Sequence, residues 1–422
     1  MLRLFTIPNV IAPFPSKTIP SSSTPTHCSL IRAKMSSDSL PPPPDNRIVL
    51  GCGTVTVDFL AAVAAYPNPD DKIGSTGFKV QGGGNVGNAL TCAARLGLNP
   101  RLISKVADDT QGRSILEELK ADGVDPSFLV VSDEGNSPFT YVIVDNQTKT
   151  RTCIHTPGYP PMIPDDLSQE SLVSALDDAR VVYFDGRLPE TALVVAQEAA
   201  RKNIPILIDA ERKREGLDNL LELADYAICS AKFPQLIINT LSIQPNFGVN
   251  WSFIGLAWTE APSIPSALVS MLLRLPNLKF VIVTLGKDGC VMLERNVNGD
   301  VVSEEIDVDS LLETLRQRKD DSIGIPTCLS SPVAKLTAQG IGAVSGRLFA
   351  GTAEKIPPSE LVDTTGAGDA FIGAALYAIC ADMPPEKMLP FAAQVAAANC
   401  RALGARTGLP HRTDPCLASF LS

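Results

Sequence analysis

The chain has 422 residues, of which 45% are hydrophobic and 19% charged, an ordinary composition for a globular protein. No run of about 20 apolar residues is free of charge and proline, which argues against a membrane span. The net charge of −10 argues against a nucleic-acid partner, and three histidines are too few for a His-rich metal site.

The first 46 residues differ in composition from the rest of the chain. They are rich in Ser, Thr and Pro, and four basic residues precede the first acidic one, Asp38. This pattern is typical of an organellar transit peptide. We expect residues 1–46 to be a chloroplast (plastid stroma) targeting segment with a Pro-rich linker, followed by a folded domain over 47–415. Met35 would serve as an alternative start for a cytosolic form, and a disordered tail without an address remains the alternative.

Beyond residue 47, predicted strands alternate with predicted helices. Apolar runs predict strands over 48–53, 101–106, 181–185, 206–209, 224–229 and 280–284. Helical spacing predicts helices over 86–97, 110–123, 189–202, 366–381 and 386–402. Such alternation indicates an α/β fold, with a mostly parallel central sheet between two layers of helices. Ligands of such sheets lie beyond the carboxyl ends of the strands.

Two segments, about 59–82 and 138–154, do not follow this alternation. Both read as hairpin-like strands, and the second turns around residues 146–149. We expect them to form a small β-lid over one end of the sheet. Exposed edges of such a lid favour pairing with a second copy of the chain.

The sharpest motif, DTTGAGDA at residues 363–370, opens a predicted apolar helix. Three small residues let a backbone turn approach a ligand closely. The amides of Gly366, Ala367 and Gly368 then face an anion at the positive end of the helix. Asp369 follows directly, and it either caps the helix or accepts the proton of an alcohol that attacks a phosphate.

This motif resembles the C-terminal signature of pfkB-type (ribokinase-like) carbohydrate kinases. The resemblance implies a ribokinase-like three-layer fold, with Asp369 as the catalytic base and the amides of Gly366, Ala367 and Gly368 as the anion hole. It also implies ATP and Mg²⁺, and it makes Asp363 and Thr365 the candidates for a K⁺ site.

A glycine-rich run at residues 82–88 opens the first long helix. It formally fits a dinucleotide fingerprint, but a strand and about 30 residues precede it, where that fingerprint normally follows the first strand. It resembles the first pfkB signature better, and most closely that of ketohexokinase-like and sulfofructose-kinase-like members. The resemblance implies sugar contacts by Asp58, Gly83, Gly84, Asn85 and Asn88. The alternative interpretation of Asp58 is a loop residue at a turn.

The nucleotide side rests on the run TLGKDG at 284–289, which resembles the family's T-x-G-x-x-G. Thr284, Gly286 and Gly289 would then line the ATP site, with Asn399 near the adenine or ribose. Arg151 would approach the transferred phosphate, unless it is a solvated hairpin residue.

Two features depart from the family pattern. Its N-x-x-E motif is absent at 230–233, which puts magnesium or phosphate handling through that motif in doubt. The span 296–354 is longer than the usual link, and we expect a surface insertion there with a short helix near 311–319.

These patterns favour a sugar kinase that transfers the γ-phosphate of ATP to a ketose-like acceptor. A nucleoside kinase of the same family is the alternative, although aromatic residues are only 5% of the chain and few lie near Asp58. A non-catalytic plastid scaffold protein of pfkB type is a third interpretation, and the intact Gly366 and Asp369 argue against it.

Overall fold

The computed structural model of the chain describes residues 42–234, 258–296 and 304–421. Most of the predicted targeting segment, residues 1–41, lies outside these ranges, as does part of the acidic run at 300–309. All described residues belong to one unit, 40–422. None of the described helices is long and apolar enough to cross a membrane.

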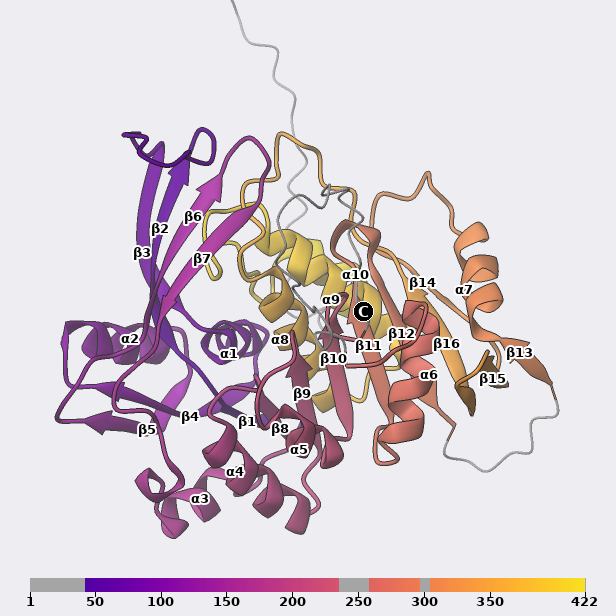
Figure 1. Cartoon of the computed structure of the whole chain (residues 1–422), viewed down its shortest axis with the longest axis horizontal. Coiled ribbons are helices and arrows are strands. Elements are labelled where there is room, and N and C mark those ends of the chain that lie inside the picture. Colours follow the sequence, from indigo (N-terminus) through magenta and orange to yellow (C-terminus); the bar gives the residue numbers. More distant parts are fainter. Residues whose placement is uncertain (1–41, 235–257, 297–303, 422) are drawn as a thin grey trace, which may run out of the picture. The chain divides into compact units, whose positions relative to one another are not determined.

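A central sheet of twelve described strands is the core of the fold (Figure 1), as the strand–helix alternation predicted. Its order is β13-β15-β16-β12-β11-β10-β9-β8-β1-β4-β5, with β14 paired to β16. In this order, neighbouring strands from β11 through β10, β9, β8, β1 and β4 to β5 pair in parallel. Strand β12 pairs antiparallel with both β11 and β16. Their bounds are β1 (Ile48–Cys52), β4 (Asn99–Ala107), β5 (Asp125–Ser132), β8 (Val181–Phe184), β9 (Ile206–Ala210), β10 (Tyr226–Ser230), β11 (Phe280–Thr284), β12 (Cys290–Arg295), β13 (Glu305–Asp307), β14 (Cys328–Ser330), β15 (Ala334–Ala338) and β16 (Gly342–Gly351).

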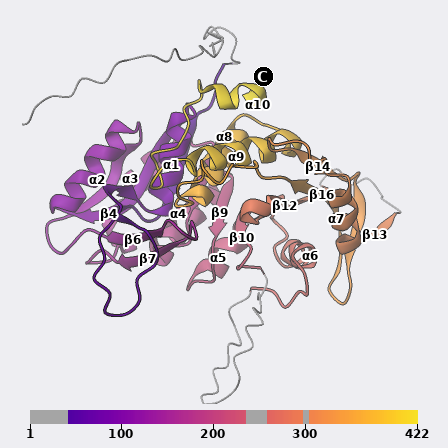
Figure 2. The ribbon, with the colours of Figure 1, turned by 90° about the horizontal axis from the view of Figure 1, so that it is seen from above.

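Helices cover both faces of this sheet. One layer contains α1 (Asn85–Arg95), α2 (Thr110–Ala121), α8 (Ala367–Cys380) and α9 (Pro385–Asn399), with the short α10 (Ala418–Leu421) beside it. The other contains α3 (Gln169–Ala175), α4 (Pro189–Arg201), α5 (Leu217–Glu222), α6 (Ile264–Arg274) and α7 (Val308–Gln317). Figure 2 shows α8 and α9 on one side of β9 and β10, and α5 on the other.

The continuous apolar strands explain this sandwich. In β8, Val181 and Tyr183 belong to the core under α1 and α8, while Val182 and Phe184 belong to the core under α4. Successive side chains of a strand point to opposite faces, so a strand that is apolar throughout must be covered on both. The three-layer prediction is therefore confirmed.

A second sheet of four strands forms the predicted lid, in the order β3-β2-β6-β7. Its strands are β2 (Thr56–Val63), β3 (Gly77–Gly83), β6 (Phe139–Asp145) and β7 (Arg151–Thr156). Leu60, Val142 and Val144 form a small core of their own, apart from the two main ones.

The long segment before the second motif does more than lie on the surface. Its strands β13, β14, β15 and β16 extend the central sheet beyond β12, and β16 pairs with β12 from Cys290↔Gly351 to Arg295↔Gly346. The short helix expected near 311–319 is α7, which buries Val308, Leu312 and Leu315 against the core. Much of this segment is therefore part of the fold's framework.

Candidate active site

Two pockets meet at the N-terminal end of α8. The first, of about 390 Å³, lies between the lid strands and the carboxyl ends of β9, β10 and β11. The second, of about 420 Å³, lies between the residues after β11 and helices α8 and α9. Thr284 and Gly368 line both, so a molecule in one pocket would touch a molecule in the other at this point. We call them the acceptor pocket and the nucleotide pocket.

The turn before α8 requires glycine. Gly366 is the N-cap of this helix with φ 74°, a left-handed conformation, and a β-carbon there would lie 2.6 Å from that of Ala405. Gly368 faces open space, and it lines both pockets. The Ala367 amide donates to Thr364 O over 3.3 Å. This arrangement presents the positive end of a 14-residue helix at the junction of the two pockets.

Asp369 lines the acceptor pocket in the first turn of α8. The helix has no side-chain cap, so of the two roles predicted for Asp369 the structure does not show the cap. Its Oδ2 instead accepts a hydrogen bond of 2.8 Å from Asn88 Nδ2. Burial raises the pKa of Asp369 to about 6, with the Asn88 bond opposing and the charge of Glu211 adding to the rise.

Arg406 holds the Asn88 side chain in place, and sequence reasoning missed it. Its Nε donates to Asn88 Oδ1 over 2.9 Å and its Nη2 to Gly83 O over 3.1 Å. Because Asn88 Oδ1 is occupied in this way, its Nδ2 is directed to Asp369. Arg406 is 3% exposed and lies beyond both motifs, in a segment without a recognisable pattern.

The predicted sugar-binding residues gather at the start of α1. Asp58 lines the acceptor pocket and accepts a hydrogen bond of 2.7 Å from Thr56 Oγ1, and burial raises its pKa. Gly84 is the N-cap of α1 with φ 83°. Asn85 Nδ2 lies 3.4 Å from Asp209 Oδ2. Gly83 is not a lining residue; it supports Asp58, which a β-carbon at this position would strike.

Arg151 connects the lid with the second motif. It projects from β7 into the acceptor pocket, and its Nη1 donates to Thr364 Oγ1 over 3.2 Å. The lid therefore places a guanidinium beside the turn that precedes α8.

The nucleotide pocket contains Thr284, Gly286 and Gly289, the residues predicted to line the ATP site, together with alanines of α9. Asn399 is different: it is fully buried and donates to Thr365 O over 2.9 Å. The Asn399 side chain therefore turns inward and holds the motif turn, and its place near the adenine or ribose stays a prediction. Ala396, Ala397 and Cys400 face the pocket instead.

The two residues assigned to a cation are also bonded within the turn. Asp363 Oδ1 accepts from the amide and the hydroxyl of Thr365, at 2.9 and 2.7 Å, and its Oδ2 accepts from Gly404 N at 2.9 Å. In the structure these bonds fix the loop that leads into α8. A K⁺ role for this pair stays a prediction.

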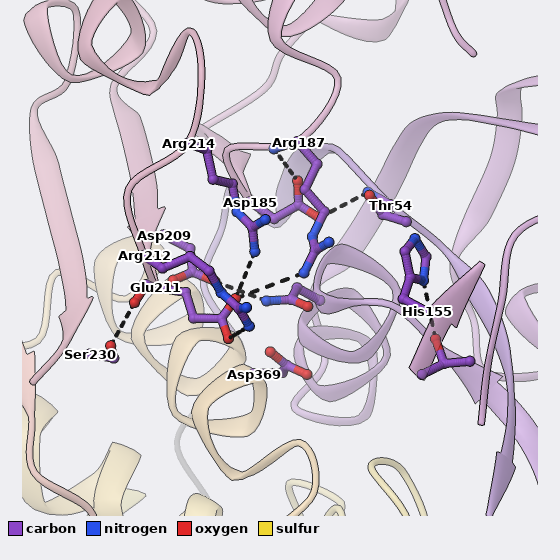
Figure 3. Close-up of polar contacts among 12 residues, drawn as sticks. Thr54, His155, Asp185, Arg187, Asp209, Glu211, Arg212, Arg214, Ser230 and Asp369 are labelled. Atoms are coloured by element: carbon purple, nitrogen blue, oxygen red, sulfur yellow. Dashed lines mark hydrogen bonds and ion pairs between the residues drawn. The ribbon is translucent and has the colours of Figure 1, made fainter. Parts of the chain in front are cut away.

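The acceptor pocket also holds a charged cluster that the motifs did not reveal. Figure 3 shows Arg187, Arg212 and Arg214 around Glu211, with Asp369 beyond them. Where the family carries N-x-x-E, Ser230 lines the pocket and donates to Glu211 O over 2.6 Å. The only signal for the cluster was its place after two strands, β8 and β9.

A family model described as pfkB family carbohydrate kinase matches residues 49–309 and 327–412. Among curated proteins, mouse ribokinase is 22% identical over 377 residues, which cover 88% of this chain and 94% of that protein. Probable fructokinase-3 of Arabidopsis thaliana is 23% identical, and the match covers 89% of this chain and 91% of that protein. Mouse ketohexokinase is 22% identical over a shorter stretch, covering 44% and 64%.

Solved structures agree on the fold. Ribokinase from Thermotoga maritima has a TM-score of 0.60 at 20% identity, covering 89% of this chain and 99% of its own. Ribokinase of Arabidopsis thaliana, solved in complex with ribose and ATP, has a TM-score of 0.55 at 17% identity, with 90% and 99% covered.

Proposed function

The chain belongs to the pfkB family of carbohydrate kinases, and from that premise we propose that it transfers the γ-phosphate of ATP to a hydroxyl of a ketose-like sugar. One observation carries the proposal. Asp369, oriented by Asn88, lies in the acceptor pocket where that pocket meets the nucleotide pocket at the start of α8.

In the proposed reaction, Asp58, Asn85 and Asn88 bind the sugar hydroxyls, and one hydroxyl faces Asp369. Its oxygen attacks the γ-phosphorus, the bond from that phosphorus to the β-phosphate oxygen breaks, and ADP leaves with the electron pair. The hydroxyl proton passes to the Asp369 carboxylate. A pKa of about 6 suits this role, because the group is ionised at neutral pH yet still basic enough to take a proton.

The backbone at Gly366 and Gly368 would stabilise the charge on the transferred phosphoryl group. Positioning and electrostatic stabilisation dominate phosphoryl transfer, and the N-terminal end of a helix supplies both without side chains. Arg151, bonded to Thr364, would add a positive charge at the same place.

The proposal includes Mg²⁺ as the partner of ATP. Across the described ranges, no cluster of three or more His, Cys, Asp or Glu could hold a metal ion. This fits Mg²⁺, which is usually held by substrate phosphates and water with one or two carboxylates. The ion would neutralise charge on the phosphates.

A sugar fits the acceptor pocket better than a nucleoside. The described lining of that pocket contains no Phe, Tyr or Trp. A nucleobase is usually held by stacking on such side chains, whereas sugar hydroxyls need the carboxylates and amides found here. Membership of the ketohexokinase-like subgroup is part of this proposal.

We further propose that the chain forms a homodimer through the lid. Phe78, Tyr141 and Ile154 of the lid strands are 66%, 51% and 53% exposed. An apolar sheet face of this kind favours a partner. The apparent mass in solution tests whether the chain dimerises, and we expect the mass of a dimer. A monomer at micromolar concentration would contradict the proposal.

Targeting to the plastid stroma is likewise a proposal, supported by the composition of residues 1–46. A fusion of these residues to a fluorescent protein should enter plastids. Fluorescence confined to the cytosol would contradict the proposal.

The kinase proposal is tested by measuring ADP formation with the chain from residue 34 onward, against ketoses, aldoses and nucleosides. We expect sugar-dependent ADP release that requires Mg²⁺. Asp369→Asn, prepared in the same way, controls for contaminating kinases. Turnover of nucleosides alone would favour the alternative, and ATP binding without any turnover would contradict the proposal.

A further inference from the structure

The charged cluster of the acceptor pocket is not explained by the binding of a neutral sugar. Arg187 follows β8, and Arg212 and Arg214 follow β9, so the carboxyl ends of two neighbouring strands deliver three guanidinium groups to one place. All three line the acceptor pocket (Figure 3).

The three arginines of this cluster converge on one carboxylate, Glu211. Glu211 is shared: Arg212 Nη2 bonds its Oε1 at 2.7 Å, Arg214 Nη2 its Oε2 at 2.9 Å, and Arg187 Nη2 lies 3.8 Å from Oε2. The second carboxylate is Asp185, whose oxygens accept from the amides of Thr54 and Arg187. A third carboxylate, Asp209, also lines the pocket, but its hydrogen-bond partner is Asn85. Among the described residues, Arg212 and Arg214 bond Glu211 directly, whereas the Arg187 guanidinium lies 3.8 Å or more from any carboxylate oxygen.

Arg187 is the least closely paired of the three arginines. Arg187 Nε is buried and has no hydrogen-bond partner among the described residues, and it lies 4.0 Å from Asp185 Oδ2. Burial and then the charge of Arg187 lower the pKa of Arg214. Burial lowers the pKa of His155 as well, and Arg187 and Arg214 lower it further. Residues 235–257, which the structure does not describe, contain no charged residue that could supply a counter-charge.

The pocket in which these arginines lie indicates what they would bind. None of the three lines the nucleotide pocket, whose basic lining residues are Lys287 and Lys355. The cluster instead shares a pocket with Asp58, Asn88 and Asp369, the groups assigned to the acceptor. It is therefore positioned for the acceptor molecule.

We propose that the acceptor carries an oxyanion, a carboxylate or a phosphate, away from the hydroxyl that is phosphorylated, and that Arg187 and Arg214 bind it. A planar guanidinium matches two oxygens of either group, and such charge-assisted pairs are strong where water is partly excluded. The inference rests on the proposed kinase function and narrows its substrates to sugar acids or sugar phosphates.

The test compares kcat/KM for matched acceptors of equal carbon number: a neutral ketose, the corresponding sugar acid, and the ketose monophosphate. We expect an anionic acceptor to exceed the neutral one by about 100-fold or more, because a site built for a polar group rejects an analogue that lacks it. The acid and phosphate arms identify which oxyanion is bound. Equal turnover of neutral and anionic acceptors would overturn the inference.

Arg214→Gln should lower kcat/KM for the preferred anionic acceptor by about 10- to 100-fold, with KM for ATP unchanged. Arg113→Gln is the matched control, because Arg113 pairs with Asp108 on the surface, outside both pockets. A variant whose KM for ATP rises while the acceptor KM stays constant would assign the cluster to the nucleotide phosphates and overturn the inference.

A binding measurement keeps the test valid if the variant folds poorly. Without ATP, the anionic acceptor should raise the melting temperature of the wild-type chain more than the neutral ketose does, and added salt should reduce the difference. Equal shifts from both compounds would contradict the inference. Turnover of neutral sugars alone would contradict this inference but support the kinase function. Anion binding without turnover of any acceptor would contradict the kinase function but not the presence of an anion site.

Discussion

The two pockets on either side of the α8 N-terminus are lined by different types of residue. The nucleotide pocket is lined mainly by glycines, alanines and apolar side chains such as Phe371, with Lys287, Glu354 and Lys355 at its charged positions. The acceptor pocket is lined by arginines, carboxylates and amides, with His155 and Thr140 from the lid. If both pockets bind the ligands proposed for them, the first would recognise its ligand mainly by shape, and the second by charge and hydrogen bonds.

Under the proposed function, this difference predicts where specificity resides in the molecule. Small residues of α9 and the glycine turns would leave space for one nucleotide whatever the acceptor is. The charged loops after β8 and β9 would determine which acceptor binds. Changes in one pocket should therefore leave the other intact, except at the turn that both share.

Gly366→Ala should affect both pockets at once and have the largest effect. Its left-handed conformation and the contact with Ala405 leave no room for a β-carbon, so the turn before α8 must shift. We expect kcat to fall about 100-fold or more, because a misplaced reacting group costs this much. Gly324→Ala, where a β-carbon meets open space, is the control and should keep full activity. Equal activity of both variants would contradict a shared turn.

Ala396→Phe should affect ATP binding in the nucleotide pocket and leave acceptor binding unchanged. Ala396 lines the nucleotide pocket, and a phenyl group there would occupy the nucleotide's space. We expect KM for ATP to rise about 10- to 100-fold while KM for the acceptor changes less than about twofold. Ala398→Phe, on the same helix but not a lining residue, should leave KM for ATP near the wild-type value. A comparable increase of KM for ATP in both variants would mean that the substitutions distort α9 and do not report on the pocket.

Arg406→Met tests the support beneath the acceptor pocket. Its loss leaves Glu118 and Asp122, at 3.6 and 3.7 Å, without this partner, and we expect a loss of about 3 kcal/mol in the free energy of unfolding. Without Arg406 the bond from Asn88 that lowers the pKa of Asp369 weakens, so the pH–rate profile should move to higher pH.

Arg347→Met, which removes partly exposed ion pairs with Glu294 and Glu386, should cost less than Arg406→Met and leave that profile in place. A profile that stays unchanged in Arg406→Met would show that Arg406 has only a structural role.

Asp369→Asn should also stabilise the fold slightly. The folded pKa of about 6 exceeds the ordinary 3.8, so wild-type folding carries a penalty that is absent below about pH 4 and complete above about pH 6. The variant should therefore gain about 1 to 3 kcal/mol over the wild type at pH 8, and little at pH 4. Urea unfolding at both pH values checks this. A gain that is independent of pH would mean that burial of Asp369 is not its cause.

The sequence identified the parts that local pattern determines. The Gly366–Asp369 motif, the glycines before α1 and the lid strands lie close to their predicted places, because each depends on backbone geometry or on alternating apolar residues. The predicted helix over 366–381, for example, is α8 at Ala367–Cys380.

Contacts that arise from long-range packing could not be predicted from the sequence. Arg406 reaches Asn88 across 318 positions, and no local signal marks such a contact. Asn399 lies on the expected helix, but helix rotation decides whether a side chain faces the pocket or the core. The cluster around Glu211 could be predicted only from the strand order, because it forms where the ends of β8 and β9 lie side by side.

The most direct test of the account is a single-turnover measurement of phosphate transfer at saturating ATP and acceptor, with wild type and Asp369→Asn, between pH 5 and 8. The account predicts a wild-type rate that falls below an apparent pKa of about 6, and a variant that binds ATP normally but transfers about 1000-fold more slowly. A variant within about tenfold of the wild type, with the same pH dependence, would show that Asp369 is not the base.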